Sequence, residues 1–300
     1  MKKSVSLLLA ALMLTGALAG CGISASTSTG AQDSSAADTG VSGAVTVISR
    51  EDGSGTRGAF VELTGVEEKN ADGQKVDNTT ADAEIANKTD VVLTSVAGNE
   101  KAIGYISLGA LNDTVKAVKV DGAEATVDNV KAGAYKLSRP FNIATKGELT
   151  GVAKDFISFI LSKEGQAVVT DNKYIAVNDA AESFVSDGSS GQIAVGGSSS
   201  VSPVMEKLIE AYKSVNPNAS IDLQTSDSTS GMTGAMDGTF AIGMASRELK
   251  DEEAAQLTGT AIALDGIAVI VNPANTIDEL SMDQIKSIYV GDITDWGDLA

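Results

Sequence analysis

The stretch SREDGSGTRGAF, residues 49–60, follows the strand-like run AVTVIS and precedes the helix-like run GAFVELTG. Its glycines match the pattern G-x-G-x-x-G of a dinucleotide-binding turn. Such a site also needs a second strand that ends in an acidic residue about 20 positions further on. Asp77 has that spacing, but the polar segment before it predicts no strand. A P-loop needs Lys and then Ser or Thr after its glycines, and here Thr56 and Arg57 follow. The sequence therefore argues against a nucleotide site.

The same stretch has the properties of a site for a small anion. Its glycines allow successive backbone N–H groups to converge on one point, and the helix that follows adds its free N–H groups and positive dipole end. Ser54 and Thr56 can donate through hydroxyls, and Arg50 and Arg57 through guanidinium groups. The alternative is an ordinary glycine-rich turn with capping hydroxyls, which does not require two arginines.

Further turns of this kind follow other strand-like runs. GGSSSVSP, residues 196–203, has three successive serines where one N-cap would suffice. Hydroxyl groups also gather in QTSDSTSGMTGAM (residues 224–236), and Ser246 and Arg247 end a strand in IGMASRELK (residues 242–250). Turns at the carboxyl ends of strands predict a ligand in a crevice between two α/β lobes.

Composition excludes several classes of function. The 300 residues carry a formal net charge of −18, which disfavours a nucleic-acid partner. The chain has no histidine, so a Ser-His-Asp triad and His-ligated zinc are excluded. Cys21 is the single cysteine, so an intramolecular disulfide cannot form. We expect no catalytic residues, no metal and no cofactor.

The N-terminus predicts export. Residues 1–21, MKKSVSLLLAALMLTGALAGC, have two lysines, an apolar run and then small residues, as in a secretory signal. The ending LAGC resembles a bacterial lipobox, which implies lipidation of Cys21; the alternative is an ordinary cleaved signal with an incidental cysteine. Residues 22–43 are rich in Ser, Thr, Ala, Gly and Asp and predict a flexible linker. The protein is expected at the extracellular face of the cytoplasmic membrane, held by its lipid.

Strand-like and helix-like runs alternate from residue 44 onward, which predicts an α/β fold with mainly parallel sheets. The predicted strands are 45–48, 91–93, 102–106, 115–120, 193–195, 241–244 and 267–271. The predicted helices are 151–162, 203–215 and 278–290. A polar break at 179–191 divides the body into 44–178 and 191–300. Two independent domains, or one fold with a long surface loop, would both fit this division.

Several segments together resemble PstS-type phosphate-binding proteins, the extracellular receptors of phosphate ABC importers. They are SREDGSGTRGAF, GGSSSVSP, DGTFAIGMASRELK, ALDGIAVIVNP, GDITDW and AIGYISLG, and the resemblance covers nearly all of 44–300. It implies a two-lobed periplasmic-binding-protein type II fold with a hinge and an inter-lobe cleft. No single motif is specific, but the joint set is.

The segments stand in a different order from that of the family, where GGSSSVSP comes first and SREDGSGTRGAF follows mid-chain. The chain therefore resembles a circularly permuted member, in which the loop 179–191 joins the old termini and residues near Ala44 and Ala300 lie close together. Two half-domains from a fused tandem gene are the alternative. The resemblance implies one lobe at 139–263 and another at 44–138 plus 264–300, with crossovers near 138–142 and 264–267.

The resemblance also implies the site and its action. A phosphate ion would be held in a cleft that closes about a hinge, and ABC transporter permease subunits would receive it. Arg50 should face Ser199 and Ser228 across that cleft. The candidate acceptors for the proton of a protonated phosphate are Asp52, Asp227 and a hydroxyl lone pair, although Asp52 is better suited to orienting Arg50. The residues implied are Arg50, Ser54, Gly55, Thr56, Ser199, Ser200, Ser228, Ser246 and Arg247, with weaker support for Arg57, Asp52 and Ser198.

Three alternatives remain open. The cleft could bind another tetrahedral oxyanion, such as sulfate. It could belong to an extracellular phosphatase, although the sequence supplies neither a metal site nor an activated nucleophile. The scaffold could also serve as a phosphate sensor or a surface adhesin without transport.

Overall fold

The computed structural model describes residues 41–299. The predicted signal peptide and residues 22–40 of the predicted linker lie outside the described residues, as does Ala300. No helix within 41–299 is long and apolar enough to cross a membrane.

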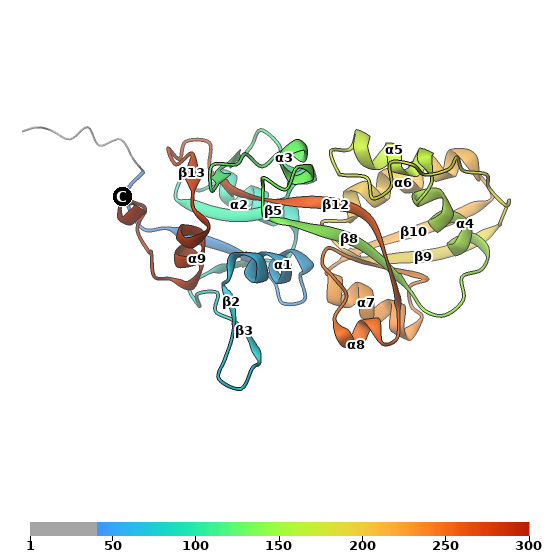
Figure 1. Cartoon of the computed structure of the whole chain (residues 1–300), viewed down its shortest axis with the longest axis horizontal. Coiled ribbons are helices and arrows are strands. Elements are labelled where there is room, and N and C mark those ends of the chain that lie inside the picture. Colours follow the sequence, from blue (N-terminus) through green and yellow to red (C-terminus); the bar gives the residue numbers. More distant parts are fainter. Residues whose placement is uncertain (1–40, 300) are drawn as a thin grey trace, which may run out of the picture. The chain divides into compact units, whose positions relative to one another are not determined.

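One sheet runs through the described residues, with its strands in the order β10, β9, β11, β8, β12, β5, β1, β4 (Figure 1). At its two ends neighbouring strands are parallel, and in the middle β8 and β12 are antiparallel to each other and to the strands beside them. Mainly parallel pairing is thus right for the ends and wrong for the middle, because β8 and β12 cross between the ends in opposite directions. The strands are β1 (Thr46–Arg50), β4 (Glu84–Ala86), β5 (Ala102–Ser107), β8 (Ser138–Thr145), β9 (Gly191–Ser198), β10 (Ala219–Ser226), β11 (Ile242–Ala245) and β12 (Thr258–Val271).

Short strands lie outside this path. β6 (Lys116–Ala117) pairs with β12, β7 (Lys119–Val120) pairs with β13 (Glu279–Leu280), and β2 (Glu67–Lys69) forms a hairpin with β3 (Lys75–Asp77). A strand therefore does lead up to Asp77, contrary to the prediction. It pairs only within the hairpin, so it supplies no second strand of a dinucleotide-binding unit.

Several helices, α9 among them, begin after a residue whose side chain caps the first turn. Ser281 caps α9 by accepting from the Gln284 N–H at 3.1 Å, and the Gln284 side chain accepts from the Ser281 N–H at 2.9 Å. This capping box explains why α9 begins later than the predicted 278–290. The helices are α1 (Gly55–Thr64), α2 (Thr89–Ala97), α3 (Val127–Lys131), α4 (Gly151–Ile160), α5 (Lys163–Asp171), α6 (Ser202–Val215), α7 (Ser228–Asp237), α8 (Asp251–Ala254) and α9 (Met282–Val290).

One predicted strand is a helix. Residues 91–93 lie inside α2, where Val92 and Val96 are fully buried and Val91 is exposed. The apolar run is short enough to suit either structure, and burial of residues four apart shows the helical period.

Two separate hydrophobic cores flank the crossing strands. One is built within 47–137 and 267–296 together with Ile175, and we call this part the β1 lobe. The other is built within 141–263, and we call it the β9 lobe. Figure 1 shows β8 and β12 side by side between the two. The cores support the predicted division of the chain, whose exact boundaries stay a proposal.

Aromatic side chains fill the centre of each core. In the β1 lobe the ring of Phe60 stacks on Tyr105 with centroids 3.9 Å apart and meets Tyr289 at 4.7 Å. In the β9 lobe Phe156 and Phe159 pack against Tyr212 with centroids 5.0 and 5.5 Å apart. The turns at the edges of each lobe are therefore attached to a closely packed hydrophobic core.

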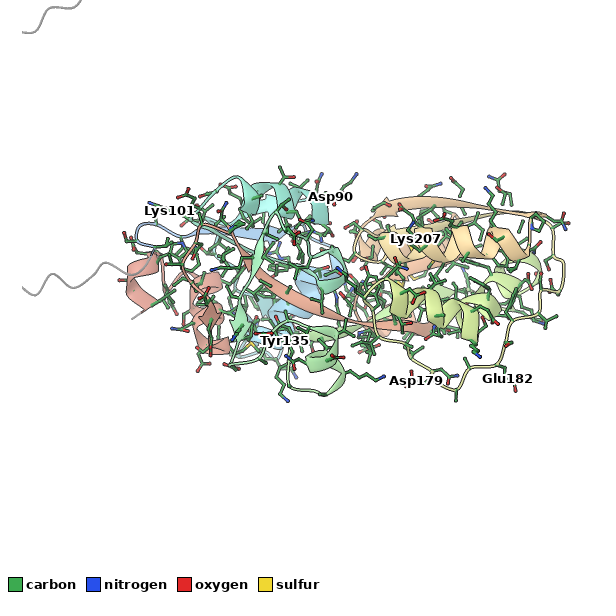
Figure 2. The ribbon with its side chains drawn as sticks, turned by 90° about the horizontal axis from the view of Figure 1, so that it is seen from above. Asp90, Lys101, Tyr135, Asp179, Glu182 and Lys207 are labelled. Atoms are coloured by element: carbon green, nitrogen blue, oxygen red, sulfur yellow. The ribbon has the colours of Figure 1, made fainter. Side chains whose placement is uncertain are left out.

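The segment 179–190 has no helix or strand; it starts between the lobes at Asp179 and runs on along the β9 lobe past Glu182 (Figure 2). Asp155 accepts hydrogen bonds from the Ser186 hydroxyl at 2.8 Å and the Asp187 N–H at 2.9 Å. These bonds fix the loop to α4, while Asp179 at its start lies 3.5 Å from Lys131 Nζ of the β1 lobe.

The two ends of the described chain meet. Ala44 forms an antiparallel bridge with Asp295, and the Trp296 N–H donates to the Gly43 carbonyl at 3.1 Å. The predicted neighbour of Ala44, residue 300, lies outside the described residues. Residues 41–43 of the predicted linker are thus held against the β1 lobe.

Candidate functional site

The turn after β1 is packed directly against the β9 lobe. Gly53 has φ +86°, and a Cβ there would lie 2.6 Å from Asp227 Oδ1. A Cβ on Gly55 would lie 2.3 Å from Ser228 Oγ and 2.8 Å from Ser246 Oγ. Both glycines are therefore required by the close approach of the two lobes.

Three strands of the β9 lobe bring their carboxyl ends to this turn. Ser198 ends β9, Ser228 begins α7 after β10, and Ser246 follows β11. The Ser198 hydroxyl donates to Ser246 Oγ at 2.9 Å, and the Ser246 N–H donates to Ser228 Oγ at 3.1 Å. The expected gathering of these serines follows from the parallel pairing of β9 with β10 and β11.

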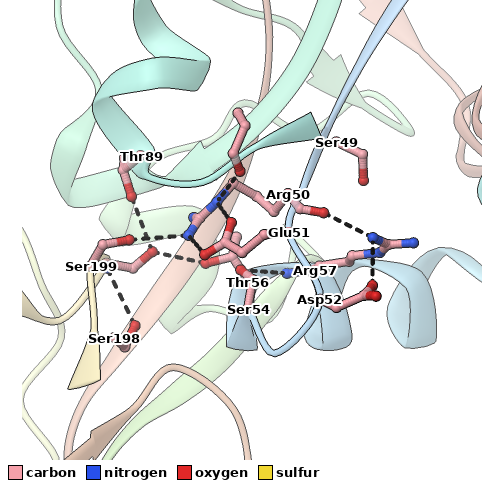
Figure 3. Close-up of polar contacts among 12 residues, drawn as sticks. Ser49, Arg50, Glu51, Asp52, Ser54, Thr56, Arg57, Thr89, Ser198 and Ser199 are labelled. Carbon is pink, nitrogen blue, oxygen red and sulfur yellow. Dashed lines mark hydrogen bonds and ion pairs between the residues drawn. The ribbon is translucent and has the colours of Figure 1, made fainter. Parts of the chain in front are cut away.

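Hydrogen bonds join the two lobes through the predicted residues (Figure 3). Arg50 Nη2 donates to Ser199 Oγ at 3.1 Å, and Thr56 Oγ1 lies 2.8 Å from Ser200 Oγ. All four side chains are buried. Arg50 therefore bonds Ser199 as expected, whereas its hydrogen bonds do not include Ser228, and these contacts join the two lobes directly.

Glu51, not Asp52, orients Arg50. The Glu51 carboxylate accepts from Arg50 Nε at 2.8 Å and from Nη2 at 2.9 Å. Asp52 instead pairs with Arg57 at 3.1 Å, and its side chain is 99% exposed. The expectation that Asp52 orients Arg50 is wrong, because its place in the turn directs the carboxylate to solvent.

Arg57 lies outside the serine cluster. Its guanidinium donates to the Arg50 carbonyl at 3.0 Å, to Asp52 at 3.1 Å and to Asp77 at 2.7 Å. Figure 3 shows it pointing away from Ser199. These contacts brace the turn from the solvent side.

Arg247 is held by a buried carboxylate. It donates to both oxygens of Glu253 at 2.7 and 2.8 Å and to the Thr229 hydroxyl at 3.3 Å. Burial raises the pKa of Glu253, but its hydrogen bonds with Arg247 and the Lys250 N–H outweigh burial and leave the pKa lowered. The structure thus brings Arg247 to the edge of the site without a direct bond to Arg50 or the cluster serines.

Two residues near the site were missed by sequence reasoning. Thr89 Oγ1 lies 3.4 Å from Ser200 Oγ, and Glu51 holds Arg50. Thr89 begins α2 soon after β4, so it repeats the pattern of a hydroxyl between a strand and a helix. The interpretation of 91–93 as a strand concealed that signal.

Asp227, a candidate acceptor for a phosphate proton, caps α7 and accepts from the Ser230 N–H at 2.9 Å.

The described residues contain no group of three or more His, Cys, Asp and Glu side chains able to hold a metal ion. The cluster instead offers an arginine, serine and threonine hydroxyls and the N-terminal N–H groups of α1 and α7. These are donors for an anion rather than ligands for a cation.

A fold of two α/β lobes with donors converging between them is the architecture of solute-binding proteins, and the model of the PBP superfamily domain matches residues 22–164 and 183–300. Two curated relatives match end to end. "Phosphate-binding protein PstS 2" of Streptococcus agalactiae serotype V is 50% identical over 301 residues, covering 99% of this chain and 98% of that protein. The protein of the same name from Streptococcus pneumoniae serotype 4 is 48% identical over 297 residues, covering 99% of each.

A solved structure agrees. The phosphate-binding protein of a phosphate ABC transporter from Streptococcus pneumoniae TIGR4 has a TM-score of 0.70 and 50% identity, covering 86% of this chain and 100% of that one. The chain therefore belongs to the PBP superfamily and, within it, to the PstS-type phosphate-binding proteins. Because the matches run end to end, the streptococcal relatives share its segment order. The expectation that the chain is not an enzyme agrees with the names of these relatives, each of which describes a binding protein.

Proposed function

We propose that the protein captures inorganic phosphate between its lobes and delivers it to an ABC importer. The observation that carries this proposal is the contact of Arg50 with Ser199 at 3.1 Å, which joins two strand-end turns of different lobes. An anion at this contact would receive the Arg50 guanidinium from one lobe and the Ser199 hydroxyl from the other. It would therefore favour the closed form over an open one.

Two serine hydroxyls of the cluster keep a proton that they can donate. Ser54 Oγ accepts from the Arg57 N–H at 3.3 Å, and Ser228 Oγ accepts from the Ser246 N–H at 3.1 Å. A hydroxyl that accepts from a backbone N–H still has its own proton to donate. With the Gly55 and Thr56 N–H groups at the start of α1, these donors suit a tetrahedral oxyanion.

Titration calorimetry with phosphate, sulfate and molybdate tests this function. We expect heat with phosphate from the wild-type protein and none from Arg50→Ala. Arg57→Ala is the comparison variant, because Arg57 braces the turn from outside the serine cluster, and it should lose less phosphate affinity than Arg50→Ala does. Heat with sulfate or molybdate but not with phosphate would contradict the choice of ligand.

Delivery from the outer face of the membrane is the second part of the proposal. It rests on the lipobox-like LAGC at 18–21 and on the match to a phosphate ABC transporter component. In cells grown with a labelled fatty acid, the wild-type protein should become labelled, and the Cys21→Ala variant should not. A deletion strain should lose high-affinity phosphate uptake; unchanged uptake would favour a sensor or adhesin instead.

A further inference from the structure

A buried ion pair links the two crossing strands. Arg139 on β8 and Asp265 on β12 are directly opposed in the antiparallel register, with Arg139 Nη2 3.1 Å from Asp265 Oδ2. Their side chains are 2% and 0% exposed. Ser107, at the end of β5, donates its hydroxyl to the other oxygen of Asp265 at 3.0 Å. The pair thus lies where the β1 lobe, the β9 lobe and both crossing strands meet.

Stability alone does not account for this pair. Removing two charges from water costs several kcal/mol, and apolar replacements of a buried pair are commonly neutral or stabilising. Within residues 41–299, Arg139 Nε and the nearby Tyr174 hydroxyl are buried without a hydrogen-bond partner. Burial also raises the pKa of Asp265 to about 6, although Arg139 opposes the rise. The incomplete satisfaction of this cluster points to a role other than holding the fold together.

The second end of the arginine reaches the proposed site. Arg139 Nη1 donates to the Ser246 carbonyl at 3.1 Å. The same residue, Ser246, accepts from the Ser198 hydroxyl at 2.9 Å and donates its N–H to Ser228 at 3.1 Å. One guanidinium therefore joins the crossing strands to the residue on which the serine cluster is built.

A neighbouring side chain on β8 repeats this arrangement. Asn142 Nδ2 donates to the Arg247 carbonyl at 3.0 Å, one residue along from the Arg139 contact. Two successive carbonyls of the segment after β11 therefore accept hydrogen bonds from side chains of the crossing strand β8. A change in the crossing strands would be transmitted to the serine cluster through these bonds.

We propose that Arg139 is a positioning residue for anion capture: it places Ser246, and through it Ser198 and Ser228, relative to the crossing strands on which the lobes close. This inference rests on the proposed function, because it assigns Arg139 to the same site. It requires both ends of the guanidinium fork, since one end holds Asp265 and the other holds Ser246.

The test compares affinity with stability in two variants. The first is the double variant Arg139→Met, Asp265→Leu, which removes both charges at once and therefore leaves no unpaired charge buried. We expect a folded protein whose unfolding temperature falls by no more than the loss of partners for the Ser107 hydroxyl and the Ser246 carbonyl explains, and phosphate affinity reduced about tenfold or more. If the pair were merely structural, the folded variant would bind phosphate with wild-type affinity.

Arg139→Lys provides the second measurement if the double variant does not fold. A single ammonium keeps the charge opposite Asp265 but does not reproduce the fork toward Ser246. We expect near-wild-type unfolding and a several-fold loss of phosphate affinity. Wild-type affinity in a folded variant of either kind would overturn the positioning role while leaving the proposed function intact. No phosphate binding by the wild-type protein would overturn both.

Discussion

Arg50 and Ser199 are 149 positions apart in the chain, yet Arg50 Nη2 lies 3.1 Å from Ser199 Oγ. Each residue stands at the end of a strand in its own lobe. The bond requires the two lobes to be in contact, so under the proposed function it would link lobe closure to anion binding. Glu51, which orients Arg50, and the glycines that allow the lobes to approach should then matter for phosphate affinity as much as the residues that contact the anion.

Glu51 should be necessary for phosphate affinity, because it fixes two donors of the Arg50 guanidinium at 2.8 and 2.9 Å. Glu51→Ala releases the arginine to other rotamers, and we expect the dissociation constant for phosphate to rise about tenfold. Asp52→Ala is the matched control. The Asp52 side chain is 99% exposed, so this variant should bind phosphate with the wild-type affinity. Calorimetry of both variants measures this, and equal losses would reject Glu51 as the orienting group.

Gly55→Ala should prevent complete closure. The added Cβ would lie 2.3 Å from Ser228 Oγ, which is held by the Ser246 N–H and cannot simply rotate away. We expect phosphate affinity to fall by at least tenfold, with scattering profiles in phosphate that remain those of an open form.

The control for that change is Gly58→Ala, one turn along α1. Its Cβ would meet only Arg247 Cδ at 3.7 Å, an ordinary contact. We expect unaltered affinity and a gain in stability of about 0.5–1 kcal/mol, as for alanine replacing glycine inside a helix. If Gly55→Ala binds phosphate as tightly as Gly58→Ala does, the packed interface is not needed for capture.

How much of this site the sequence predicts depends on the kind of contact. Strand-end serines converge because parallel strands share an edge, so Ser198, Ser228 and Ser246 could be grouped from the pattern alone. Which of two successive carboxylates, at 51 and 52, meets Arg50 depends on the direction of each side chain in the turn, and composition carries no such information. Arg139 and Asp265 pair across strands whose register depends on the whole sheet.

The pH dependence of stability should show the cost of burying Asp265. Its pKa is raised by burial from 3.8 in the unfolded chain to about 6 in the folded one. Between these values the folded protein binds a proton that the unfolded chain has lost, so this group makes the free energy of unfolding decrease as pH rises from about 4 to about 6. Below that window the contribution is constant, and above it the decrease, of the order of 3 kcal/mol, is complete.

The measurement is the difference in free energy of unfolding between wild type and Asp265→Asn, from urea titrations at several pH values. Other carboxylates cancel in this difference, whereas asparagine does not titrate. We expect the advantage of wild type over the variant to shrink between pH 4 and pH 6. A constant difference would show that Asp265 keeps its ordinary pKa.

The permuted segment order can be tested by reversing it. Ala44 bridges Asp295, so a short linker added after the C-terminal residues would lead back to residue 44 from neighbouring backbone. A chain that begins at Gly191, continues through this join and ends near residue 178 would restore the order expected of other family members. It breaks only the loop 179–190, which has no helix or strand and is tied to the β9 lobe by Asp155.

We expect the rearranged chain to fold and to bind phosphate within about threefold of the natural order, because every contact of the site is retained. It should lose some stability, since the bonds from Asp155 to Ser186 and Asp187 would be removed with the loop. Calorimetry and urea titration measure the two effects separately. If instead the two pieces bind phosphate only when expressed as separate chains, they are half-domains of a fused gene, and the permutation is wrong.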